Sequence, residues 1–123
     1  MRIRPERVGH RMQREIAEIL ARELRDPRLG AMVSVTDVEV TADLSFARVF
    51  VSVLSEGAER DRVLEGLDRA TGFIRHSLGP RLGLREVPQL KFLLDTSLER
   101  GARVEDLLKR IERGEKIEDG EES

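Results

Sequence analysis

The sequence predicts one domain of the α+β class, with elements in the order helix, strand, strand, helix, helix, strand. Apolar residues recur every three or four positions over residues 5–25 and 58–82, which is the spacing of a buried helical face. Apolar and polar residues alternate over residues 33–40, 46–53 and 90–94, as in half-buried strands. Because the chain has only 123 residues, it is long enough to form the hydrophobic core of one domain but not of two.

The first helix is expected from Pro5 to Leu24 or Arg25, since proline favours a first turn and Asp26-Pro27 ends the pattern. Its buried stripe comprises Val8, Met12, Ile16, Ile19 and Leu20. A second stripe, roughly opposite, comprises Arg4, Arg7, Arg11, Arg14, Arg22 and Arg25. Two interpretations of these arginines stay open. They form either a solvated face paired with Glu15, Glu18 and Glu23, or a surface for phosphate groups.

Two strands are expected after a turn at residues 26–30, and the short segment between them favours an antiparallel hairpin. In the first strand the apolar phase shifts between Val35 and Val38, which predicts a bulge. In the second strand, alternate apolar residues from Ala47 to Val53 share one face.

The second helical stretch carries the apolar register Val63, Leu67, Ala70, Ile74, Leu78 and Leu82. A glycine inside a helix costs about 1 kcal/mol relative to alanine, so Thr71-Gly72 is predicted to join two packed helices. Val87-Pro88 then favours extended backbone before the last strand. The domain is expected to span residues 1–97, with a helical extension at 98–113 and a disordered acidic tail at 114–123.

The net charge of −2 hides two basic segments, residues 1–28 and 73–93, within an otherwise acidic chain. Only three of the 22 basic residues are lysines, and arginine can bind phosphate through two parallel hydrogen bonds. No apolar run approaches the roughly 20 residues of a membrane span. The absence of cysteine excludes disulfides and thiolate chemistry and fits a reducing compartment, so the cytoplasm is expected.

Catalysis is not indicated by any motif. His10 and His76 are the only histidines, neither has a second ligand at metal spacing, and both are expected at the surface. No glycine-rich phosphate loop and no Gly-x-Ser-x-Gly sequence occurs. We therefore predict no catalytic residue, no metal and no cofactor, and we keep a DNA-binding or protein-interaction module as the alternative.

Several motifs occur in a specific order: Asp26-Pro27-Arg28, the hairpin, the run from Ala70 to Arg75, and Val87-Pro88 through Ser97. In this order the chain resembles bacterial ribosome-binding factor A over about residues 5–100. The resemblance implies a K-homology-like fold of the second topological type, in which a kink at Ala70, Thr71 and Gly72 replaces the usual Gly-x-x-Gly loop. It also implies a ribosome biogenesis factor that binds the free 30S subunit and assists late maturation and 5′-end processing of 16S rRNA, including cold adaptation.

The resemblance and the two basic segments together give eight candidate RNA-binding residues. They are Arg4, Arg7, Arg11, Arg14, Arg75, Arg81, Arg85 and Lys91. We expect a monomer whose partners are the 30S subunit, its 16S rRNA and other assembly factors, with no membrane partner. With no Tyr or Trp for base stacking, the arginines are expected to contact folded RNA while the kink sets the helix angle.

Overall fold

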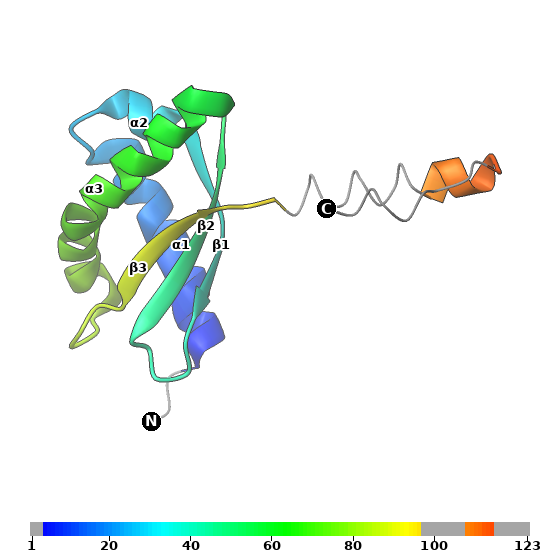
Figure 1. The fold of residues 1–123 in the computed structure, drawn as a ribbon. Helices are drawn as coiled ribbons and strands as arrows, with labels where there is room; N and C mark the ends of the chain where they lie inside the picture. The colour runs from blue at the N-terminus through cyan, green and yellow to red at the C-terminus, as the bar shows by residue number, and fades with distance from the viewer. Residues whose placement is uncertain (1–3, 97–107, 115–123) are drawn as a thin grey trace.

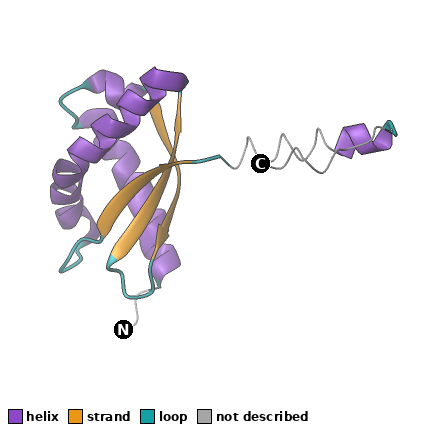
Figure 2. Cartoon of the chain, viewed as in Figure 1, coloured by secondary structure: helices purple, strands orange, loops and turns teal. Residues whose placement is uncertain are grey.

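The computed structural model describes residues 4–96 and 108–114 of the chain, and it has the expected α+β class (Figures 1 and 2). The elements are α1 (Pro5–Arg22), α2 (Pro27–Ala31), β1 (Val33–Val40), β2 (Phe46–Val53), α3 (Gly57–Leu82) and β3 (Gln89–Leu94). Residues 108–112 are also helical. The remainder of the predicted 98–113 extension and, beyond Gly114, the predicted acidic tail lie outside the described residues.

The sheet has the strand order β1-β2-β3, so β2 is the central strand. β1 and β2 form the predicted antiparallel hairpin, and their register shifts between Val35 and Asp37, which confirms the predicted bulge. β3 lies parallel to β2, with Ala47 opposite Leu90 and Val49 opposite Phe92. Parallel neighbours need a crossover connection, and α3 provides it. The long helices α1 and α3 therefore cover one face of the sheet (Figure 1).

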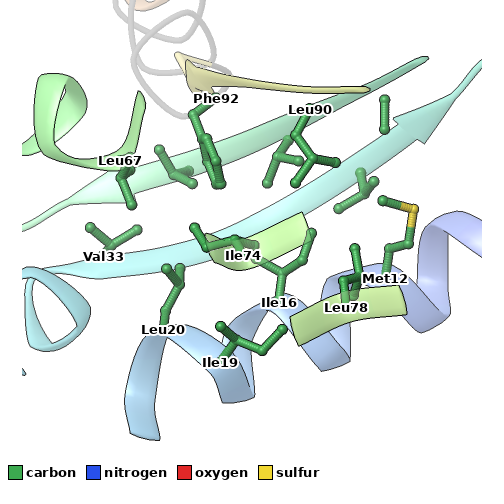
Figure 3. Close-up of a cluster of buried hydrophobic side chains, with 14 of the residues drawn as sticks. Met12, Ile16, Ile19, Leu20, Val33, Leu67, Ile74, Leu78, Leu90 and Phe92 are labelled. Carbon is green, nitrogen blue, oxygen red and sulfur yellow. The ribbon is translucent and has the colours of Figure 1, made fainter. Parts of the chain in front are cut away.

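The core lies between these two helices and the sheet (Figure 3). Its fully buried side chains include Met12, Ile16, Ile19 and Leu20 of α1 and Leu67, Ile74 and Leu78 of α3, which confirms both predicted stripes. On the sheet side, Val49, Val51 and Phe92 are buried. Ala70 of the predicted α3 register is only half-buried.

Two local predictions are wrong. Residues 26–30 do not form only a turn, because Asp26 accepts a hydrogen bond from the backbone N–H of Arg28 and begins the short helix α2. The expected junction at Thr71-Gly72 is not a break, because α3 continues through it. The Thr71 hydroxyl donates to the carbonyl oxygen of Leu67 at 3.1 Å, a bond that often bends a helix without ending it. The axis of α3 is visibly bent in Figure 1.

Gly83 ends α3, with a φ of 64° in the left-handed region that favours glycine. The backbone can then turn back toward β3. Within the described residues, no helix is long and apolar enough to cross a membrane.

Candidate nucleic-acid interface

The exposed side of α1 carries an arginine surface. Arg4, Arg7, Arg11 and Arg14 are all exposed, and we call these four residues the α1 arginine face. Arg7, Arg11 and Arg14 line an open depression of about 620 Å³ together with His10 and Gln13. On the other side of the helix Val8, Gly9 and Met12 are buried against the sheet and α3, so the arginines must point to solvent.

Gly9 explains how closely α1 approaches the sheet. A Cβ atom at this position would lie 2.6 Å from the carbonyl oxygen of Val38 in β1, closer than any side chain tolerates. The small residue therefore lets the helix backbone pack against the strand. Gly9 therefore determines how close α1 lies to β1 and in which direction the α1 arginine face points.

The glutamates of α1 pair with Arg81 of α3, and not with the arginines of α1. Arg81 donates to Glu15 and Glu23, each at 2.9 Å, and its Nη1 lies 3.5 Å from Glu18. The hydrogen bond to Glu15, followed by the charges of Glu23 and Glu18, raises the pKa of the Arg81 guanidinium. The interpretation of the α1 arginines as partners of these glutamates is therefore wrong. Within the described residues, Arg7 and Arg14 have no ion-pair partner.

Three further candidates make bonds within the fold. Arg75 donates to the carbonyl oxygens of Val87 at 2.7 Å and Pro88 at 3.0 Å, and so ties α3 to the segment that leads into β3. Arg11 donates to the carbonyl oxygen of Arg81 at 2.6 Å, although its side chain stays at the surface. Lys91 lies 3.8 Å from Asp68.

Arg85 is exposed in the turn after α3. This turn lies close to α1, because Arg7 and Arg11 line a second hollow together with Leu82 and Leu84. Arg85 follows Leu84 in this turn, whereas Arg75 and Arg81 have partners within the fold. Both histidines lie at the surface, as expected. Among the described residues, no group of three side chains could hold a metal ion.

Sequence reasoning missed a second arginine cluster. A hollow of about 810 Å³ between α2 and the first half of α3 is lined by Arg25, Arg28, Arg62 and Arg69, with Leu29, Met32 and Val63 also contributing. Arg62 and Arg69 belong to a stretch whose acidic residues outnumber its basic ones. A count along the chain cannot find a cluster that the fold assembles from distant segments.

The fold and these surfaces define a small α+β protein with an arginine-rich helical face. The family model of ribosome-binding factor A matches residues 4–108. Two relatives named ribosome-binding factor A are 46% identical over 114 residues in Halothermothrix orenii and 41% identical over 115 residues in Caldanaerobacter subterraneus subsp. tengcongensis. These alignments cover 93% and 94% of this chain, and the same shares of the relatives. The chain therefore belongs to the ribosome-binding factor A family.

Solved structures of the family share the fold. The crystal structure of ribosome-binding factor A from Thermus thermophilus is 28% identical, with a TM-score of 0.65 over 75% of this chain and 97% of that one. A homology model of the Thermus thermophilus factor, fitted into a cryo-EM map of a 30S complex of that factor, is 30% identical with a TM-score of 0.59. It covers 72% of this chain and 91% of its own.

Proposed function

We propose that this protein binds the free 30S ribosomal subunit through the α1 arginine face and assists late maturation of its 16S rRNA without catalysis. The supporting observation is that Arg7 and Arg14 are exposed and, among the residues that the structure describes, have no ion-pair partner. Both lie on a helix that packs against the sheet. Guanidinium groups held in this way can contact phosphates without first breaking an internal ion pair. Family membership supports the choice of partner, because a relative is known as part of a 30S complex.

The proposed role includes help with processing of the 5′ end of 16S rRNA and with growth in the cold, and it places the protein in the cytoplasm. A small factor that holds a particular rRNA conformation can do this by binding alone, since it lowers the free energy of the bound state. The measurement is primer extension on 16S rRNA from cells that lack the factor, grown warm and cold. Unprocessed 5′ ends should accumulate, most of all in the cold, and mature ends at wild-type levels would contradict the processing role.

The binding test compares two double variants with the same reduction in charge. Arg7→Ala with Arg14→Ala removes two residues of the α1 arginine face, and Arg48→Ala with Lys109→Ala, the control variant, removes two exposed basic residues that are not among the candidate RNA-binding residues. Cosedimentation with 30S subunits, 50S subunits and whole ribosomes is measured across a salt series. Each arginine–phosphate pair that a variant removes should reduce the slope of log affinity against log salt by roughly 0.7 to 0.9.

We expect the α1 variant to lose affinity and salt dependence while the control variant keeps both. Equal effects of the two variants would show that net charge, and not the α1 arginine face, sets the affinity. Binding of the wild-type protein only to 50S subunits, or equally to duplex DNA at the same salt, would contradict the proposed function. Arg81→Ala is unsuitable for this test because it leaves three glutamates without their partner.

A further inference from the structure

We propose that Phe73 on α3 is a stacking platform for an unpaired base of the RNA, with Arg69 and His76 holding the neighbouring phosphates. This inference rests on the proposed function, since it adds a contact to the same partner. It assigns a role to the helix surface beside Gly72.

Among the described residues, Phe73 is one of few large apolar side chains at the surface, with 46% of its area exposed. Arg69 and His76 are four residues before it and three residues after it, so both flank the ring on one side of α3. Both are exposed, and within the described residues neither makes a hydrogen bond or an ion pair. At Gly72 an added Cβ would meet no atom within 4 Å, so the space beside the ring is open.

The surroundings of Phe73 favour a nucleic acid over a protein. A protein interface of useful strength has a contiguous apolar centre, whereas Phe73 stands between charged and small residues. Isolated aromatic rings among basic side chains are typical of single-stranded RNA binding, because every base offers a flat face. Glu65, four residues before Arg69, is the nearest acid along this side of the helix, and Asp68 is paired with Lys91.

The second arginine cluster gives the RNA strand a path to this ring. Arg69 lines the hollow between α2 and α3 together with Arg25, Arg28 and Arg62. Asp26 and Glu59 are the acids among the lining residues, so the four arginines leave an excess of positive charge. Phosphates along this hollow would bring the next base onto Phe73, one turn further along α3.

The absence of Tyr and Trp makes a direct test possible. In Phe73→Trp the new indole is the only strong fluorophore, and stacking of a base on it should quench its emission when protein-free 16S rRNA is added. The matched control is Phe46→Trp, because Phe46 has a similar exposure of 39% but lies at the start of β2, next to the turn that holds Asp43. Its emission should not change.

Affinity for 30S subunits provides the second measurement. Phe73→Leu keeps an apolar side chain but removes the aromatic face, and it should weaken binding roughly 5- to 100-fold. Phe73→Trp keeps an aromatic face and should therefore retain wild-type affinity. Phe46→Leu should leave the affinity for 30S subunits unchanged.

Wild-type affinity of Phe73→Leu, or no quenching of Phe73→Trp by RNA that it binds, would overturn the stacking proposal. Loss of affinity in Phe73→Leu without quenching in Phe73→Trp would also overturn it, since the ring would then contact protein. The proposed function is tested separately by Arg7 and Arg14. If their variant loses binding while Phe73→Leu does not, the α1 arginine face stands and the stacking contact fails.

Discussion

At the scale of single residues, hydrogen bonds to the Asp43 carboxylate stabilise its ionised form. The carboxylate accepts from the Thr41 hydroxyl at 2.8 Å, the Ser45 hydroxyl at 2.7 Å and the Ser45 backbone N–H at 3.0 Å. The bonds from Ser45, followed by the bond from Thr41, lower the pKa of Asp43 from 3.8 to about 2. The turn between β1 and β2 therefore depends on an ionised aspartate. It also holds Leu44 at a φ of 62°, which is uncommon for leucine.

We expect the turn to loosen in acid. Because the folded-state pKa is lowered, the contribution of Asp43 to stability is fully present above about pH 4 and is lost as the pH falls through about 2. The measurement is an NMR titration of the Ser45 amide, whose shift should follow a pKa near 2. Asp43→Asn is the control, and its Ser45 amide should show no such titration. A midpoint near 3.8 in the wild-type protein would contradict the prediction.

The arginines show which properties of a candidate binding surface can be predicted from sequence. The exposure of Arg7, Arg11 and Arg14 followed from helical spacing alone, because spacing decides which side of α1 is buried. The partners of Arg81 are 58 to 66 positions away along the chain, and no local pattern indicates such contacts. The sequence pattern therefore predicts whether an arginine of α1 is exposed. It does not predict whether an arginine side chain is already engaged by acidic residues from a distant part of the chain.

At the scale of elements, two helical glycines have opposite surroundings. Gly9 of α1 faces the carbonyl oxygen of Val38, whereas Gly72 of α3 faces open space. Sequence reasoning placed a helix junction at Gly72 because glycine has a poor intrinsic helix propensity. The packing of Leu67, Ile74 and Leu78 on both sides of Gly72 outweighs that penalty and keeps α3 continuous.

We expect the same substitution to have opposite effects at these two positions. Gly72→Ala should stabilise the protein by about 0.5–1 kcal/mol, since alanine is the better helix former and meets no atom. Gly9→Ala should destabilise it by roughly 1–3 kcal/mol, because overpacking against the β1 backbone outweighs the gain in propensity. Urea unfolding of both variants measures the difference. A destabilised Gly72→Ala would show that the glycine at this position is required for the bend in α3.

At the scale of the whole molecule, one core joins every large element. Side chains from α1, α3 and all three strands belong to a single buried cluster. The class of fold was predictable from periodicity, because each element has to bury one face. The parallel pairing of β3 with β2 was not predicted, since alternation identifies a strand but not its neighbour or direction.

This shared core predicts cooperative unfolding. Ile16→Ala should cost about 2–5 kcal/mol, because Ile16 is completely buried between the helices and the sheet. Circular dichroism and hydrogen exchange in β3 should report the same loss, as expected for a two-state domain. Leu54→Ala, at a residue with 81% exposure, should change little. Loss of protection in α1 alone would show that the helix unfolds independently.

The position of β3 has a consequence for how the protein is made. Of the core residues in the described part of the chain, Leu90 and Phe92 are the last to be translated, yet they lie on β3 beside the central strand β2. A nascent chain that ends before residue 94 has both long helices and the hairpin but lacks one wall of its core. Contacts between segments far apart in sequence also form slowly. The domain therefore reaches its full stability only after nearly all of its residues 4–96 have been synthesised.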